Sequence, residues 1–232
     1  LQAVVGSWAA ELAGQTAPAL DVQARTRFNE ANDSHYYLVP GVIVTIMTMI
    51  GALLTSLVMA REYERGTLES LFVTPVGSGE ILTAKAATNF LLGMVSLAIS
   101  MVFAAFVFDI PIRGSLLLLL AVSALFLIVA LGLGLVISTA TKNQFLACQF
   151  AIMGTFMPAL MLSGFLYDIL NMPPAVRAVT YLIPARYYVT LLQTLFLAGD
   201  IPSVIIPCCI TLGVFAVVLM SIARLKAPKS LE

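Results

Sequence analysis

The sequence predicts an all-α polytopic membrane protein, and three observations support that prediction. Of the 232 residues, 60% are hydrophobic and only 10% are charged, with a mean hydropathy of +1.01, well above the range of soluble domains. Long uncharged runs recur along the chain, and at ~1.5 Å per residue each can cross a ~30 Å hydrocarbon core. The charged residues gather between these runs, as expected if the runs lie in the membrane.

Five spans follow from the positions of the apolar runs. We place them at residues 38–60, 84–108, 114–141, 144–163 and 201–224. Gly132 and Gly134 in the third span would let a neighbouring helix approach closely, because small side chains allow backbones to meet in lipid. Residues 1–37 are mixed in polarity and cannot span a bilayer. We expect them to be the remnant of an external domain whose earlier part is missing.

The distribution of Lys and Arg predicts the orientation of the spans, since cytoplasmic loops carry an excess of positive charge. One side holds seven basic residues: Arg61, Arg65, Lys85, Lys142, Arg224, Lys226 and Lys229. The short loops of the other side hold Arg113, Arg177 and Arg186. The first side is therefore predicted to be cytoplasmic.

The segment from residue 61 to 74 is the densest run of charge in the chain. Thr67 follows Gly66 and can cap a short helix with Glu69 in its first turn. Such a helix would be amphipathic, and one alternative is that it merely rests on the bilayer surface. Helices that lie on membranes are usually rich in Lys and Arg, whereas this segment mixes both signs of charge. The mixture favours contact with a protein partner.

Residues 164–199 are apolar but interrupted, so they do not form a clean span. Asp168, Pro173, Pro184 and Arg186 all fall within them. We expect a re-entrant or interfacial pair of short helices, because broken backbone at membrane depth requires protein or water to satisfy it. Aromatic residues gather at membrane interfaces, and the cluster of Tyr181, Tyr187 and Tyr188 is predicted to lie there.

No catalytic, metal or cofactor site is predicted in this chain. It contains no Gly-x-x-x-x-Gly-Lys-Ser/Thr phosphate loop, so it has no ATP site of its own. The cysteines lack metal-ligand or redox spacing, and the single histidine, His35, lies at the predicted external boundary of the membrane. The balance of 12 basic and 12 acidic residues gives no indication of nucleic-acid binding.

The apolar cores of the spans lack Asp, Glu, Lys, Arg and His. Carriers driven by ion gradients usually place such groups inside the membrane, so their absence weakens that class of function. Uncharged polar residues do occur within the spans. Thr88, Asn89 and Gln149 are candidates for a substrate path, although contacts between helices are the more common role of such residues.

The charged segment closely resembles the cytoplasmic loop of ABC-2 type transporter permeases. The matching positions are Arg61, Glu62, Glu64, Arg65, Gly66, Thr67, Glu69, Leu71, Thr74 and Pro75, followed by Glu80, Ile81, Leu82 and Lys85. Residues 162–165, 171–173 and 181–187 resemble the final external hairpin of that family. Residues 36–41 resemble the entry to its second helix in members with a large external domain. The resemblance covers nearly all of residues 36–224.

The resemblance implies a type V exporter-like bundle of six membrane helices per subunit. Two such subunits would face each other, with two ATP-binding subunits on the cytoplasmic side. Five spans are visible here, so the first helix of the family is expected to be absent. The loop at 61–74 would form a coupling helix that seats against the ATPase. Its contact and hinge positions would be Glu62, Glu64, Arg65, Gly66, Thr67 and Glu69.

The resemblance also implies an external hairpin, with its positions at Ser163, Gly164, Asp168, Pro173, Pro184 and Arg186. Many relatives carry Pro where this chain has Asp168, so the path of the hairpin is open. We expect the permease subunit of an ATP-driven exporter in a bacterial inner membrane, moving a lipophilic drug-like or lipid substrate. ATP and Mg would bind to the partner ATPase. A gradient-driven carrier and a non-transporting membrane scaffold remain alternatives, as do homodimer and heterodimer.

Overall fold

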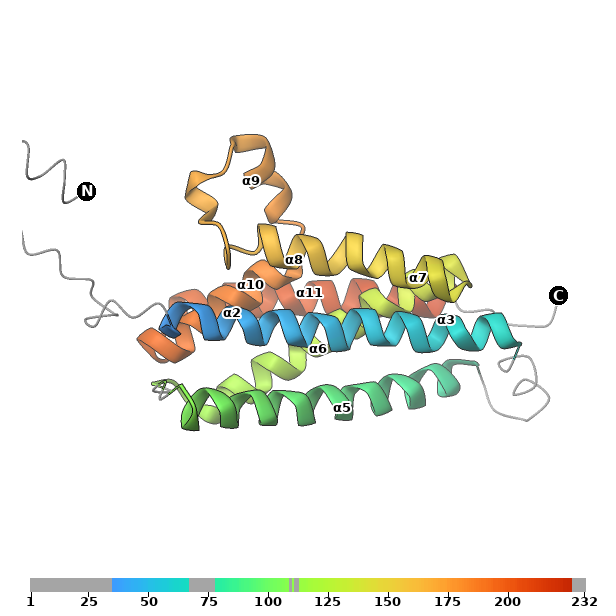
Figure 1. Ribbon diagram of the computed structural model, residues 1–232, viewed down its shortest axis with the longest axis horizontal. Coiled ribbons are helices and arrows are strands. Elements are labelled where there is room, and N and C mark those ends of the chain that lie inside the picture. Colours follow the sequence, from blue (N-terminus) through green and yellow to red (C-terminus); the bar gives the residue numbers. More distant parts are fainter. Residues whose placement is uncertain (1–34, 67–77, 109, 111–112, 227–232) are drawn as a thin grey trace, which may run out of the picture. The chain divides into compact units, whose positions relative to one another are not determined.

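The computed structural model describes residues 35–66, 78–108, 110 and 113–226, and no strand occurs among them. These residues form a bundle of helices that run in alternating directions (Figure 1). Five helical stretches are long and apolar enough to cross a membrane. The prediction of an all-α polytopic membrane protein is therefore confirmed.

The five spanning stretches occupy the predicted regions of the chain. The first combines α2 (His35–Thr48), the π-helical segment η1 (Met49–Leu54) and α3 (Thr55–Arg65). The second and third are α5 (Ser78–Phe106) and α6 (Leu116–Thr141). The fourth combines α7 (Gln144–Ala151), the π-helical segment η2 (Ile152–Phe156) and α8 (Met157–Leu162), and the fifth is α11 (Pro202–Lys226).

The first spanning stretch is longer than predicted, and this changes the outline of the charged segment. The helix continues past residue 60 to Arg65, because α3 contains no Gly or Pro and the next such residue is Gly66. Gly66 ends it in the left-handed conformation, with φ of 65°, and donates its N–H to Tyr63 O at 3.3 Å. Glycine adopts this cap conformation without steric cost. Residues 61–65 thus belong to the spanning helix, and not to a separate helix at 61–74. The rest of that predicted helix, including Thr67 and Glu69, lies outside the described residues.

Helix α6 lies at the centre of the bundle, where it contacts α3, α5, α10 and α11. Its glycines allow the close approach that the sequence predicted. A Cβ at Gly134 would lie 2.7 Å from Ala52 O of η1, and one at Gly132 would lie 3.0 Å from Leu219 Cβ of α11. Buried Phe126 and Leu127 of α6 contribute to the main hydrophobic core around these contacts.

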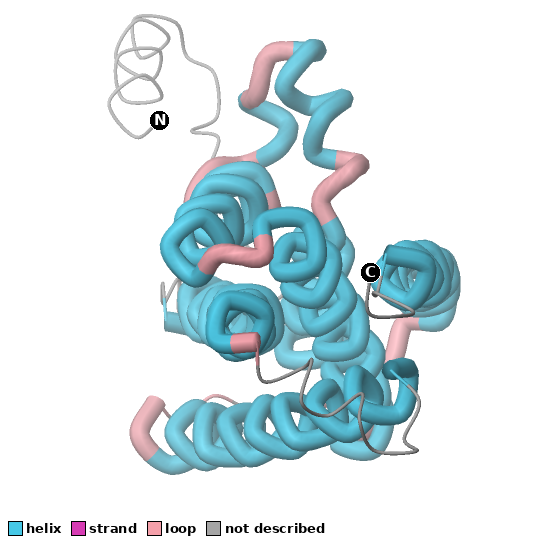
Figure 2. Tube along the Cα trace, turned by 90° about the vertical axis from the view of Figure 1, so that its right-hand side faces the viewer, coloured by secondary structure: helices cyan, strands magenta, loops and turns pink. Residues whose placement is uncertain are grey.

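The segment between α8 and α11 forms four short helices. It begins with the 3-10 turn η3 (Ile169–Asn171) and α9 (Pro174–Thr180), then continues through α10 (Pro184–Gln193) and the π-helical segment η4 (Thr194–Ala198). Seen along the spanning helices, the part around α9 stands apart from them (Figure 2). Helix α10 instead packs against α2, α6 and α11. This segment therefore contains an outlying hairpin followed by a helix that returns into the bundle.

The placement of Tyr188 corrects the prediction of an interfacial tyrosine cluster. Tyr188 is fully buried, stacks on Phe126 of α6 at 4.1 Å between ring centroids, and donates from its hydroxyl to Ser123 Oγ at 2.8 Å. Tyr181 is exposed and Tyr187 is half-buried. The reason lies in the helical period of α10 and η4: Ala185, Tyr188, Leu192 and Leu195 recur three or four residues apart and share one buried face.

We expect Gly134→Ala to destabilise the bundle by about 1–3 kcal/mol, the usual cost of forcing an extra group into a packed interior. The added methyl group would meet a backbone oxygen, which has little freedom to move away. Gly213→Ala in α11 is the matched control, since nothing lies within 4 Å of its Cβ position. Thermal unfolding in detergent, followed by circular dichroism, checks both variants. Equal midpoints for the two would contradict this account of the α6 packing.

Candidate functional site

The last turns of α3 carry a polar cluster at the end of the bundle that the Lys and Arg distribution predicts to be cytoplasmic. We call Arg61, Glu62, Glu64, Lys85 and Gln144 the inner polar cluster. Within it, Glu62 of α3 forms an ion pair with Lys85 of α5, and both side chains are only partly exposed. Partial burial strengthens such a pair relative to one in open water.

A second set of contacts joins α3 to the start of α7. Glu64 Oε2 accepts from the backbone N–H of Gln144 at 3.2 Å, and Arg61 Nε donates to Gln144 Oε1 at 3.4 Å. The first N–H groups of a helix lack partners within the helix, and its positive dipole end favours a carboxylate. Glu64 thus caps α7 from another helix, so one end of α3 is bonded to both α5 and α7.

Apolar and polar contacts continue this junction toward the membrane interior. Met59, Ala86, Leu135 and Ala223 form a buried group contributed by α3, α5, α6 and α11, with Tyr63 packed against it. Deeper still, Asn89 Nδ2 of α5 donates to Thr55 Oγ1 of α3 at 3.1 Å, with both residues buried. If the end of α3 moves, these contacts over several turns either oppose the movement or move α5, α6 and α11 with it.

The structure places four of the six predicted coupling residues. Glu62 and Glu64 take part in the inner polar cluster, Arg65 is exposed in the last turn of α3, and Gly66 ends that helix. Thr67 and Glu69 lie outside the described residues. The sequence did not single out Gln144, because its contact with Glu64 bridges 80 positions and no local pattern signals it.

The predicted residues of the external hairpin shape its turns. Asp168 Oδ1 accepts from Leu170 N at 3.0 Å and caps η3, while Pro173 and Pro184 precede or begin α9 and α10. Gly164 has φ of 89°, and the adjacent Ser163 is buried. Proline at the first helical position has a favourable φ and no N–H to leave unpaired. These residues fix the path of the backbone and do not converge on one site.

Arg186 belongs to a separate group of contacts around Tyr181. Its guanidinium carbon lies 3.9 Å from the centre of the Tyr181 ring, and its Nη1 donates to Thr180 Oγ1. Hydrogen bonding from Arg186, together with the positive charges of Arg186 and Arg177, lowers the pKa of the exposed Tyr181 phenol below its usual value. The positive charges of Arg177 and Arg186 thus act together on Tyr181.

The three candidates for a substrate path do not come together. Thr88 is exposed on α5 and donates to Ala84 O at 3.1 Å, Asn89 is held by Thr55, and Gln149 is exposed on α7. The sequence could not reveal this, because helix rotation decides where each residue faces. For Asn89, the hydrogen bond to Thr55 supports the alternative role, a contact between helices.

A cavity of about 370 Å3 lies elsewhere in the bundle. Its walls come from α2, α6, η2, α8, α11 and the start of α10 with the turn before it, and all its side chains are uncharged. Thr48 and Thr155 are the only lining residues with polar side chains, and both hydroxyls donate to carbonyls of their own helix. Pockets of this size and apolarity are typical of sites for small apolar ligands.

The described residues contain no group of His, Cys, Asp or Glu that could hold a metal ion. Their polar groups make structural contacts between helices, and the chemistry available at the inner polar cluster is charge pairing and hydrogen bonding. Such a site can bind and transmit displacement. It offers no arrangement of nucleophile and base within the part of the chain that the structure describes.

Comparison with known proteins agrees with the fold. Residues 5–225 match the family model described as ABC-2 family transporter protein. The probable multidrug ABC transporter permease YbhS of Escherichia coli K12 is 48% identical over 224 residues, which are 96% of this chain and 59% of that protein. The probable multidrug ABC transporter permease YbhR of the same strain is 30% identical over 202 residues, 85% of this chain and 54% of that protein.

A third relative, the inner membrane transport permease YhhJ of Escherichia coli K12, is 28% identical over 228 residues, 98% of this chain and 61% of that protein. The chain thus spans a little over half the length of these relatives. The five spanning helices among its described residues, together with its relatives, identify a multi-pass protein of the inner membrane. Because the family model covers nearly the whole sequence, the chain belongs to the ABC-2 family of transporter membrane proteins.

Proposed function

We propose that this chain is part of the permease subunit of an ATP-driven exporter in a bacterial inner membrane. ATP and Mg bind to a separate ATPase subunit on the cytoplasmic side, and a second permease subunit, identical or related, completes the membrane part. Family membership and the names of the relatives support this proposal. The inner polar cluster is the observation that carries it, since it joins the end of one spanning helix to two others.

The proposed mechanism starts where the chain leaves α3 at Gly66. The ATPase contacts the segment that follows, and its closure on ATP displaces this segment. Because Glu62 is paired with Lys85 and Glu64 with the start of α7, the displacement is passed to α5 and α7 as well as α3. The ATPase must contact the segment differently in its open and closed states, since only a differential interaction can shift the permease between conformations.

The class of substrate follows from what the membrane part offers. In the described spanning helices, Asp, Glu, Lys and Arg occur only toward the ends, and the cavity is lined by uncharged side chains. This supports export of a lipophilic, drug-like or lipid-type molecule. It disfavours a gradient-driven carrier, which would need a titratable or cation-binding group within the membrane.

Charge reversal tests whether the inner polar cluster transmits motion. We expect Glu62→Lys and Lys85→Glu each to reduce ATP-driven transport by roughly tenfold or more, because each places like charges together in a partly buried site. The double variant restores opposite charges and should recover most of the activity. Transport of a lipophilic dye by the full-length permease with its ATPase, in inverted vesicles, gives the readout. Lys226 is exposed in the last turn of α11, at the same end of the bundle as the inner polar cluster. The variant Lys226→Glu therefore controls for the change in net charge.

If the double variant transports as poorly as the single ones, the pair does not act as a unit and this part of the mechanism is wrong. Retention of the ATPase during purification distinguishes two causes of failure. Loss of the partner would indicate a damaged docking site. A bound partner that hydrolyses ATP without transport would indicate loss of transmission.

The exit of the chain at Gly66 provides a second test. Gly66→Val forces a β-branched residue to a φ of 65°, at a cost of about 1–2 kcal/mol, and should redirect the segment that meets the ATPase. Gly66→Asn is the matched control, because Asn tolerates the left-handed conformation. We expect Gly66→Val to insert normally but to lose coupled transport, and Gly66→Asn to retain it. Equal transport by both variants would show that the direction of the chain at Gly66 does not matter for coupling.

A further inference from the structure

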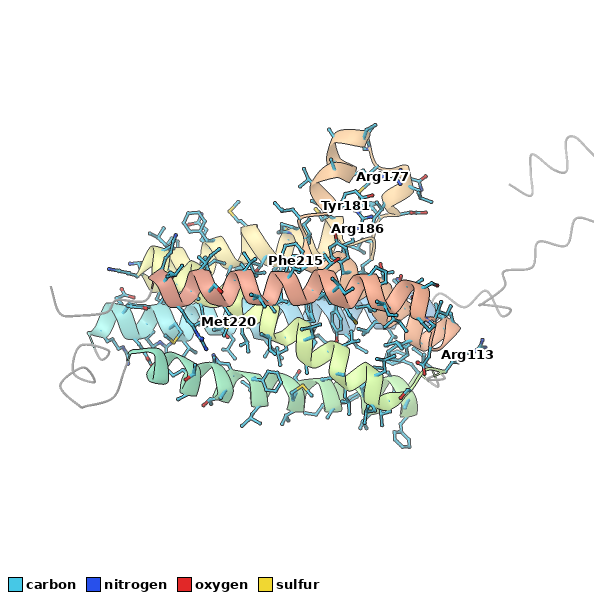
Figure 3. All side chains as sticks on the ribbon, turned by 180° about the vertical axis from the view of Figure 1, so that it is seen from behind. Arg113, Arg177, Tyr181, Arg186, Phe215 and Met220 are labelled. Atoms are coloured by element: carbon cyan, nitrogen blue, oxygen red, sulfur yellow. The ribbon has the colours of Figure 1, made fainter. Side chains whose placement is uncertain are left out.

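Thr180 links the side chain of Arg186 to the backbone of Arg177 in the outlying hairpin. Arg186 Nη1 donates to Thr180 Oγ1, and Thr180 Oγ1 donates in turn to the carbonyl oxygen of Arg177 at 2.8 Å. Thr180 is fully buried, so this connection is shielded from competing water. Arg177, Tyr181 and Arg186 consequently gather on one side of the hairpin (Figure 3).

The positive charges of this group are not neutralised by carboxylates within the described part of the chain. The only ion pair in that part joins Lys85 to Glu62, which are distant in sequence from the hairpin. Arg177 is exposed and Arg186 is half-buried, and Arg186 lies over the Tyr181 ring at 3.9 Å. Stacking holds the guanidinium plane of Arg186 in place, and the N–H groups that are not bonded to Thr180 or Tyr181 can donate to a phosphate.

The residues between Tyr181 and Arg186 form one wall of the apolar cavity. Residues 182–185 line it, opposite Phe126 of α6, Gly154 of η2 and Phe215 of α11. Tyr187 continues this contact, with its ring 6.3 Å from that of Phe215 and its hydroxyl donating to Tyr181 O at 3.0 Å. The charged group and the cavity are therefore adjacent, because a single turn of chain supplies both.

The cavity is accessible from the outside of the bundle. Leu182 and Val218, both of which line it, are 76% and 47% exposed. Nothing lies within 4 Å of the Cβ position of Gly154. Val218 and Gly154 belong to spanning stretches, so the opening lies at the level of the hydrocarbon core. The arginines are too costly to place in that hydrocarbon and must lie at the level of the lipid head groups.

We propose that this turn and the cavity together form a binding site for one anionic phospholipid of the leaflet nearest the hairpin. Arg177 and Arg186 hold the phosphate of the head group, and an acyl chain enters the cavity past Leu182. Charge complementarity favours an anionic lipid, and the apolar wall favours a hydrocarbon chain over any polar ligand. The proposed class of exported molecule rests on the same cavity, but retention of this lipid requires neither ATP nor the partner subunit and is measured without them.

Lipid retention by the full-length protein tests this site. The protein is purified in mild detergent with added phosphatidylglycerol, and native mass spectrometry counts the lipids that remain bound; phosphatidylcholine serves as the lipid without net charge. We expect the unmodified protein to retain phosphatidylglycerol preferentially. Arg177→Gln should lower this retention about tenfold, the usual effect of losing a charge-assisted hydrogen bond. Gly154→Leu should lower it as well, because its side chain would occupy the space of the acyl chain.

Two matched variants control for charge and for bulk. Arg113→Gln removes an exposed arginine from another external loop, and Gly213→Leu adds the same side chain at a position of α11 that is equally open. Both should retain phosphatidylglycerol as the unmodified protein does. Circular dichroism melting establishes that all four variants are folded before retention is compared.

Each remaining outcome overturns the proposal in a recognisable way. If only Arg177→Gln lowers retention, the hairpin is a surface anion site and the cavity holds no acyl chain. If only Gly154→Leu lowers it, the cavity takes an apolar molecule without help from the arginines. If neither does, no lipid site exists here. None of these results bears on coupling to the ATPase, which the transport experiments test separately.

Discussion

The fold depends on one constraint, that every backbone polar group inside a bilayer must find its partner within the protein. Because a helix pairs its own backbone N–H and C=O groups, side chains inside the bilayer serve mainly to pack one helix against another. Helix α6 packs against its neighbours through Gly132 and Gly134. Charged groups are thereby confined to the two ends. One end carries the inner polar cluster, and the hairpin with Arg177 and Arg186 stands out from the side of the bundle, nearer the opposite end.

Much of this arrangement could be predicted from the sequence, because hydropathy and charge placement report directly on the bilayer. The five spans, the close contacts of α6 and the interruption after residue 163 were all visible in the residues alone. Helix α3 ends later than the charge pattern predicts. Charged residues are good helix formers, and only Gly66 stops the helix.

Features that depend on rotation and on distant contacts could not be predicted in this way. Tyr188 was assigned to the interface by its residue type, although the spacing of apolar residues along α10 would have indicated a buried face. The link between Glu64 and Gln144 has no local signature. The cavity has none either, because six elements from across the sequence form its walls. Sequence patterns describe one helix at a time, whereas these features belong to their packing.

The π-helical segment η1 should let the first spanning stretch tolerate the deletion of one residue. A turn of π-helix holds one residue more than a turn of α-helix, so η1 already contains the surplus residue. Deleting one residue from a regular helix rotates everything beyond it by about 100°. Within residues 49–54 a deletion can instead convert the segment to regular α-helix, with α2 and α3 keeping their faces toward the same neighbours. Length variation in this span is therefore least disruptive at its middle, where a membrane helix is otherwise least able to accept it.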